Sequence, residues 1–189
     1  PMVAVAGYEP ARLVGQWFEV AQTPSFLEQD CHGTTAEVTA RDDTRLTLKI
    51  VCHKSSATGP ILPLDGVMAQ TDPALFEVRF VKLLELGNLT FVVLWQADDN
   101  SMVAIGSPTG QIGWIWSKSA HPDAAVLKQA KAALVGAGYK ERAIKPVDQI
   151  VTCPWMQTTD SPPTHTWPCA SHCTCTRPAR PKAVPWRAT

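Results

Sequence analysis

The feature that most constrains the fold of this chain is a series of about eight short strand-like segments, spaced roughly ten residues apart. In the clearest of them apolar residues alternate with polar ones, which is typical of a strand with one buried face. The links between segments are too short for the helical crossovers that parallel strands need. The sequence therefore predicts an antiparallel barrel or sandwich. The predicted strands are 15–22, 34–40, 46–53, 61–69, 75–81, 89–96, 102–105 and 113–117.

Two of these strands flank an acidic turn at Asp42 and Asp43, and together they predict a β-hairpin. Counting outward from the turn brings Cys31 and Cys52 near one another on neighbouring strands. A disulfide requires Cα atoms within about 7 Å, so the count favours a Cys31–Cys52 bridge. Such a bridge would indicate an oxidising compartment, and two buried thiols are the alternative.

One helix is predicted after the last strand. Pro122 and Asp123 are residues favoured in a first helical turn, and Gly138 is a typical C-terminal cap. Between them an apolar stripe recurs at helical spacing, so the helix is expected to pack on the outside of the barrel. Residues 1–151 then form one domain. Residues 152–189 are rich in Pro and Cys without periodicity, and we expect this tail to be disordered.

Composition excludes some classes of protein. The 17 basic and 17 acidic residues give a formal net charge of zero, which argues against nucleic acid as the main partner because phosphate binding needs a basic excess. No apolar stretch approaches the ~18 residues of a membrane span. The first residues lack the regions of a signal peptide, so we expect either a cytosolic protein or one whose leader has been removed.

Familiar catalytic and cofactor motifs are absent from the sequence. There is no Gly-x-Ser-x-Gly, no His-Glu-x₂-His and no phosphate loop. In the tail, Cys169, His172, Cys173 and Cys175 lack the paired spacing of a zinc site. We therefore expect no catalytic residue, no metal and no cofactor.

Two motifs about a hundred residues apart resemble those of the lipocalin family. Gly15-Gln16-Trp17 resembles the Gly-x-Trp motif that opens the first strand of the family. The segment from Gly113 to Lys118 resembles its last-strand motif, whose basic residue lies on that Trp. The resemblance covers about residues 7–150 and looks closest to bacterial outer-membrane lipocalins and apolipoprotein D. It implies an eight-stranded antiparallel up-and-down β-barrel with one helix packed outside.

The sequence departs from this family pattern at two places. The Asp and Tyr of a further family motif should fall near 97–100, where the turn has no Tyr. Lys118 stands where Arg is commoner. A lysine still offers Trp17 a cation–π contact of about 0.5–2 kcal/mol, but it lacks the fork of donors of Arg. Gly15, Trp17 and Lys118 are thus expected to have a structural role at the closed end of the barrel. We expect this end to pack somewhat less tightly than one with Arg at this position.

The resemblance implies a protein that binds and carries or stores a small hydrophobic ligand, such as a fatty acid or lysophospholipid, in the barrel. Each buried CH₂ contributes about 0.8 kcal/mol, so such a ligand could bind without a charge contact. Lys54, Arg79 and Lys82 are candidate cations for a carboxylate headgroup at the mouth. The segment 25–31 resembles the loop that covers the mouth in this family. The predicted pocket residues are Phe26 from that loop and, by shared parity on their strands, Ala36, Val38, Leu48, Ile50, Phe76, Val78, Phe80, Val93, Trp95, Ile105, Trp114 and Trp116.

Other functions stay open at this point. Some lipocalin relatives are isomerases or synthases that use a barrel thiol, and a free Cys52 could serve as that nucleophile. A third alternative is a structural or interaction module with a filled barrel. In the apolipoprotein D branch a cysteine placed like Cys31 pairs near the C-terminus, which Cys153 resembles. The family also implies a periplasmic, outer-membrane or secreted location, peripheral membrane association through an N-terminal anchor, and a monomer or weak dimer.

Overall fold

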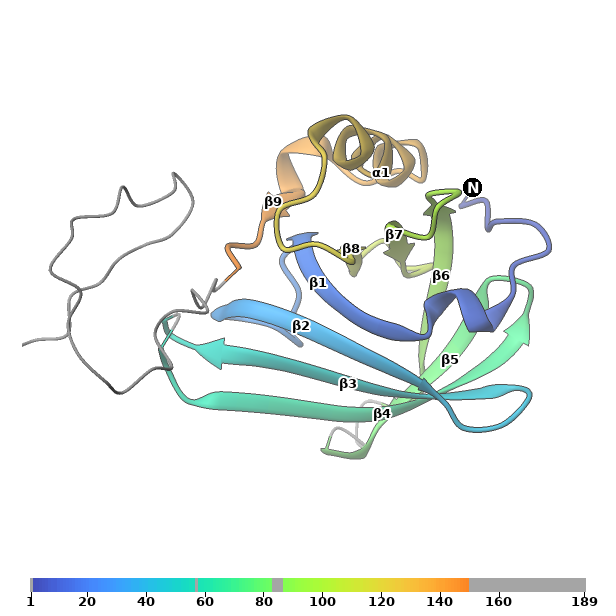
Figure 1. Cartoon of the computed structure of the whole chain (residues 1–189), viewed down its shortest axis with the longest axis horizontal. Coiled ribbons are helices and arrows are strands. Elements are labelled where there is room, and N and C mark those ends of the chain that lie inside the picture. The colour runs from blue at the N-terminus through green and yellow to red at the C-terminus, as the bar shows by residue number, and fades with distance from the viewer. Residues whose placement is uncertain (1, 57, 83–86, 150–189) are drawn as a thin grey trace, which may run out of the picture. The chain divides into compact units, whose positions relative to one another are not determined.

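The computed structural model describes residues 2–56, 58–82 and 87–149, and their strands form one antiparallel sheet (Figure 1). Strand β1 pairs with β8 on one side and with β2 on the other, so the sheet closes into a barrel. The short strand β9 (Lys145–Pro146) adds to β1. The barrel strands are β1 (Gly15–Gln22), β2 (Cys31–Ala40), β3 (Arg45–Lys54), β4 (Ile61–Asp72), β5 (Leu75–Phe80), β6 (Leu89–Gln96), β7 (Met102–Gly106) and β8 (Gly113–Ser117).

The predicted eight-stranded barrel with a helix outside is confirmed, although β4 runs to Asp72, beyond its predicted end at residue 69. Pro63 lies opposite Val51 of β3, whereas β4 pairs with β5 only from Gly66 onward. The proline therefore stands where β4 has no partner on its other side, a position that tolerates a missing N–H. The predicted tail 152–189 lies outside the described residues.

Apolar side chains of the barrel form two layers. One fills the barrel interior, and the other lies between the outer surface of the barrel and α1 (Ala124–Gly136), which contacts β6, β7 and β8 (Figure 1). Alternation along the strands produces this division, because successive side chains point to opposite faces. On β7, for example, Val103 and Ile105 belong to the interior layer, and Met102 and Ala104 to the outer one.

Both ends of α1 are capped, although Pro122 and Asp123 precede the helix and do not lie in its first turn as predicted. The Asp123 carboxylate accepts hydrogen bonds from the backbone N–H groups of Ala125 and Val126. At the other end Gly138 has a φ of +102°, and the N–H of Tyr139 donates to the carbonyl of Leu134 at 3.1 Å. This arrangement is a Schellman motif. It places Tyr139 against the β7–β8 turn, where its hydroxyl donates to the carbonyl of Ile112.

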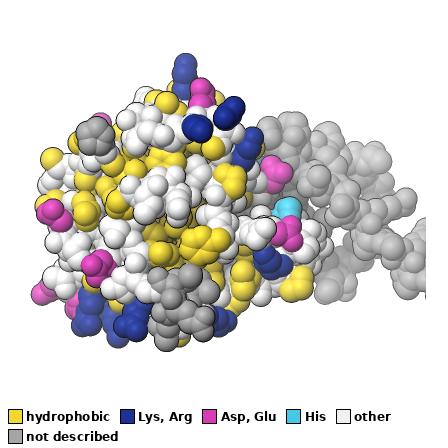
Figure 2. Space-filling view, turned by 180° about the vertical axis from the view of Figure 1, so that it is seen from behind, with side chains coloured by type: hydrophobic (Ala, Val, Ile, Leu, Met, Phe, Trp, Pro, Cys, Tyr) yellow, Lys and Arg dark blue, Asp and Glu magenta, His cyan; other side chains and the backbone are white. Residues whose placement is uncertain are grey.

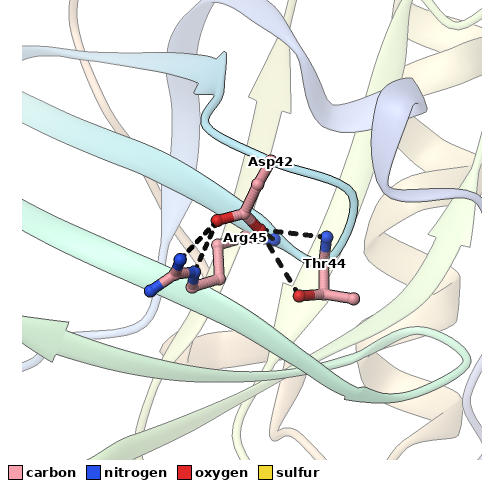
Figure 3. A network of polar contacts seen from close by, with 3 residues as sticks. All are labelled: Asp42, Thr44 and Arg45. Atoms are coloured by element: carbon pink, nitrogen blue, oxygen red, sulfur yellow. Dashed lines mark hydrogen bonds and ion pairs between the residues drawn. The ribbon is translucent and has the colours of Figure 1, made fainter.

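A compact polar network fixes the predicted turn between β2 and β3 (Figure 3). Asp42 accepts hydrogen bonds from the backbone N–H groups of Thr44 and Arg45 at 3.2 and 2.9 Å. The Arg45 guanidinium pairs with the same carboxylate at 2.6 Å and holds the pKa of Asp42 below its usual value. The turn sets the register in which Ala36 lies opposite Ile50, and thereby sends both inward.

Trp17 closes the end of the barrel where β1 begins. Its indole N–H donates a 2.7 Å hydrogen bond to the carbonyl of Leu13, the last residue of the 3₁₀ helix η1 (Pro10–Leu13). The Lys118 ammonium lies 3.5 Å from the centroid of the Trp17 ring and donates to the carbonyl of Val14 at 3.2 Å. Gly15 allows this approach, because a Cβ there would lie 2.7 Å from the Lys118 Nζ. The Trp17 side chain of β1 thus contacts both η1 and the residue that follows β8, and so holds the closed end together.

We expect Trp17→Ala to lower the free energy of unfolding by about 3–5 kcal/mol, because it removes a large buried ring together with the contact for Lys118. Urea denaturation measures the loss. Gln16→Ala, which changes the exposed neighbour on the same strand, is the control and should stay within about 0.5 kcal/mol of the wild type. A Trp17→Ala variant as stable as this control would contradict the structural role.

Candidate functional site

The interior of the barrel is the candidate site, and the structure brings together all but two of the predicted pocket residues there. Each of them exposes 2% or less of its surface, so they pack closely against one another. A ligand can enter this layer only if side chains or the covering loop move. The interior residues in question are Ala36, Val38, Leu48, Ile50, Phe76, Val78, Phe80, Val93, Ile105, Trp114 and Trp116.

The prediction for Trp95 is wrong. The pairing of β6 with β7 shifts register between Val93 and Trp95, so the alternation of β6 reverses at this irregularity. Val93 points inward, but Trp95 joins the outer layer that packs beside α1. The parity count along β6 therefore fails beyond Val93.

Among the interior side chains that sequence reasoning missed are Phe91 and Met68, both with no exposed surface. Phe91 has the parity of Val93 and could have been found by the same count. Its ring packs edge-on against Trp114 with centroids 4.8 Å apart. Met68 lies on β4, whose proline and glycine weakened the strand pattern. The interior is therefore more aromatic and more completely filled than predicted.

Phe26, the second exception, lies at the mouth and not in the interior, with 55% of its surface exposed. It borders two surface hollows. One of about 560 Å³ extends toward Tyr139 and Lys140, and one of about 210 Å³ extends toward Leu89 and Ile112. Neither hollow is lined by another of the predicted pocket residues. Phe26 therefore lies on the surface between these two hollows, outside the interior layer.

Further apolar side chains are exposed at the same end of the barrel. Ile61 at the start of β4 exposes 63% of its surface, and Val81 after β5 exposes 61%. On the face shown in Figure 2, hydrophobic side chains also lie across the middle, while Lys and Arg gather at the upper and lower edges. Together with Phe26, Ile61 and Val81 give the mouth an apolar rim.

The loop 23–30 between β1 and β2 is tied to the barrel at several points. The predicted disulfide between Cys31 and Cys52 is confirmed, with Cα atoms 5.4 Å apart. This bond replaces the alternative Cys31–Cys153 pairing, and it leaves Cys52 without the free thiol that an isomerase mechanism would need. Lys54 donates to the carbonyl of Gln29 and so holds the loop. The other two predicted cations for a headgroup, Arg79 and Lys82, are exposed.

Two buried glutamates form the most unusual feature of the interior, and the sequence analysis did not identify either. Glu19 follows Trp17 with the same parity on β1 and is completely buried opposite Trp116 of β8. Glu28 comes from the loop, exposes 2% of its surface and accepts a 2.5 Å hydrogen bond from the Trp114 indole N–H. Because Glu19 has the same parity as Trp17 on β1, its inward position could have been predicted from the sequence. Glu28 lies in an irregular segment that carries no such signal.

Burial changes the acidity of both carboxyls. Removal from water raises the pKa of Glu19 well above its ordinary value of 4.5, and the nearby Glu28 carboxylate raises it further. Burial also raises the pKa of Glu28 to about 7, a rise limited by the hydrogen bond from the Trp114 indole. Near neutral pH the two carboxyls therefore hold protons that exposed carboxyls have already released.

Several polar atoms around this pair have no hydrogen-bond partner of standard geometry. They include both carboxyl oxygens of Glu19, one oxygen of Glu28, the Trp116 indole nitrogen and the Thr34 hydroxyl. Thr34 lies near Glu19, because the Gln149 amide donates to the backbone carbonyls of both residues. Buried unpartnered groups cost about 1–3 kcal/mol each, and such groups call for an explanation.

The disulfide generates one prediction. Peptide mapping without reduction should recover Cys31 and Cys52 in linked peptides. Reduction should lower the free energy of unfolding by about 3 kcal/mol, because the bond closes a loop with a sequence separation of 21. The Cys31→Ala/Cys52→Ala variant should match the reduced protein and no longer respond to reductant at this bond. Recovery of Cys31 linked to Cys153 would contradict the pairing.

The acidic pair generates a second prediction, a fall in stability as pH rises. The folded protein keeps protons on these carboxyls that the unfolded chain releases above an ordinary pKa of 4.5. This stabilisation is complete at low pH and is lost as pH rises through about 7. The lowered pKa of the exposed Asp42 and Asp99 places their titration below this window.

Urea denaturation between about pH 5 and pH 8 should therefore show a decreasing free energy of unfolding. The Glu19→Gln/Glu28→Gln variant should lose most of the decrease. Glu9→Gln, at an exposed glutamate near the closed end, should retain it. An increase over this range in the wild type, or the same decrease in the double variant, would contradict the assignment.

Comparisons with known proteins agree with this architecture. Solved structures with the same fold include lobster apocrustacyanin A1, with a TM-score of 0.63 and 16% identity over 78% of this chain and 83% of that one. The cockroach allergen Per a 4 matches with a TM-score of 0.57 and 18% identity, over 76% and 89% of the two chains. The siderocalin Ex-FABP, described as having dual ligand specificities, matches with a TM-score of 0.56 and 13% identity, over 75% and 97%.

A search of curated protein sequences gave no match. Identities this low establish a shared fold, while the family follows from the sequence itself. The model of the lipocalin-like domain family matches residues 9–149, which is most of the chain and spans the barrel, the helix and β9. This protein therefore belongs to the lipocalin-like domain family.

Proposed function

We propose that this protein binds and carries or stores a small hydrophobic ligand inside its barrel, with an acyl chain such as that of a fatty acid or lysophospholipid. The observation that carries the proposal is the interior layer, which is apolar, rich in aromatic rings and closed at one end by Trp17. A chain buried there would gain about 0.8 kcal/mol for each CH₂ group. The pocket residues predicted from the sequence, apart from Trp95 and Phe26, supply its wall.

The mouth supports the same function. Phe26, Ile61 and Val81 present exposed apolar surface where an acyl chain would first make contact. Leu27 and Glu28 of the loop 23–30 are buried beneath it, so entry requires this loop to lift away from the interior. The Cys31–Cys52 bond holds one end of the loop while the rest moves.

The close packing of the interior favours a second candidate, a filled barrel that acts as a structural or interaction module. Val38, Leu48 and Val78 expose no surface, as expected of an ordinary core. The two candidates differ in whether any acyl ligand displaces this packing. An enzyme that uses Cys52 is not proposed, because that sulfur is in the disulfide.

We place the protein outside the cytoplasm, because the Cys31–Cys52 bond persists in oxidising compartments. No helix among the described residues is long and apolar enough to cross a membrane. The nearer relation to bacterial outer-membrane lipocalins and apolipoprotein D, the membrane anchor, and the monomeric or weakly dimeric state stay predictions.

Displacement of a fluorescent fatty acid from the delipidated protein tests the proposal, together with mass spectrometry of lipid extracted from fresh preparations. We expect binding that Ala36→Leu weakens at least about tenfold, because the larger side chain occupies interior space. Ala40→Leu, at an exposed position on the same strand, should bind like the wild type. Circular dichroism confirms that both variants fold. Absence of binding by every acyl ligand would favour the filled module.

A further inference from the structure

Among the described residues, no Lys, Arg or His forms an ion pair with Glu19 or Glu28. The ion pairs among the described residues join His32 to Asp30 and Arg45 to Asp42, and neither reaches Glu19 or Glu28. The groups that act on the two carboxyls are each other and the indoles of Trp114 and Trp116. An isolated buried carboxylate is costly unless a donor or a cation compensates it.

In the part of the chain that the structure describes, three carboxyl oxygens of the pair have no hydrogen-bond donor of standard geometry. Glu28 uses one oxygen for the Trp114 indole, and its other oxygen has no partner. Both oxygens of Glu19 are unpartnered as well. A group that brings several N–H donors and a positive charge would satisfy these atoms together, and a protonated amine has three such donors.

The surroundings of the pair are aromatic. The Trp114 indole N–H donates to Glu28, and Trp116 lies opposite Glu19. The two rings lie nearly parallel, with centroids 5.8 Å apart. Phe91 packs against Trp114 on the interior side and continues the apolar wall that would receive the rest of a ligand.

We propose that Glu19 and Glu28 bind the protonated amine of an otherwise apolar ligand, with Trp114 and Trp116 beside the charge. This inference rests on the proposed function and specifies its ligand class. A ligand with an anionic head turned inward is disfavoured, because it would add a further negative charge to the pair. The cations predicted for such a head do not reach the site, since Lys54 holds the loop and Arg79 and Lys82 are exposed.

Three probes with the same alkyl chain test this class: decylamine, decanol and decanoate. Isothermal titration calorimetry with the full delipidated chain near neutral pH measures their affinities. We expect decylamine to bind at least about tenfold more tightly than decanol, and decanoate to bind more weakly than either. Glu19→Gln and Glu28→Gln should each remove most of the amine preference, measured as the ratio of the decylamine and decanol affinities of the same variant. Glu9→Gln is the matched control and should keep the preference.

The outcomes separate this inference from the function on which it rests. Binding of decanol and decylamine with equal affinity would overturn the amine site and leave the hydrophobic pocket intact. Binding of none of the three probes would overturn both. An amine preference that survives in both glutamine variants would place the cation elsewhere and overturn the assignment. If a variant fails to fold, the comparison of the three probes on the wild type still decides whether an amine is preferred.

Discussion

The contact between the Lys118 ammonium and the Trp17 ring sets the geometry on which the rest of the barrel depends. It joins the first strand to the last and anchors η1 through the hydrogen bond from Trp17 to Leu13. By fixing Trp17 inward it also fixes the pleat of β1. Because side chains alternate along a strand, Glu19 must then point inward too. The interaction that closes the barrel therefore forces a carboxyl into its interior.

The two ends of the barrel meet their hydrogen-bonding needs in different ways. At the closed end the Trp17 N–H and the Lys118 ammonium each have a backbone acceptor. Toward the mouth, Glu19, Glu28 and Thr34 keep polar atoms without partners. The stability lost there is offset by features that need no ligand, including the Cys31–Cys52 bond and the Schellman motif that seats Tyr139 on the β7–β8 turn.

The strands and turns of the barrel are well predicted from the sequence, because alternation and turn chemistry are local properties. The hairpin around Asp42 and the pairing of Cys31 with Cys52 follow from counting along two regular strands. Trp95 shows where such counting fails, since residues 91–95 are all apolar and the irregularity in β6 leaves no mark in the pattern. Glu19 was within reach of the same count, but a charged residue in a strand is ordinarily assigned to the wetter face. The interior position of Glu28 depends on how the irregular loop 23–30 folds back over the barrel, and no local sequence rule specifies that.

A ligand that enters the barrel must displace part of the loop 23–30 from the interior. Leu27 and Glu28 occupy the upper interior in this state, and the Glu28 carboxyl is held by the Trp114 indole. A ligand that lifts the loop breaks this hydrogen bond, so its own contacts must replace it. An alkyl chain alone can replace the packing of Leu27 but has no group for the carboxyls. A ligand without hydrogen-bond donors leaves the buried carboxyl oxygens unsatisfied, which lowers its affinity. The site is therefore selective for ligands that carry donors.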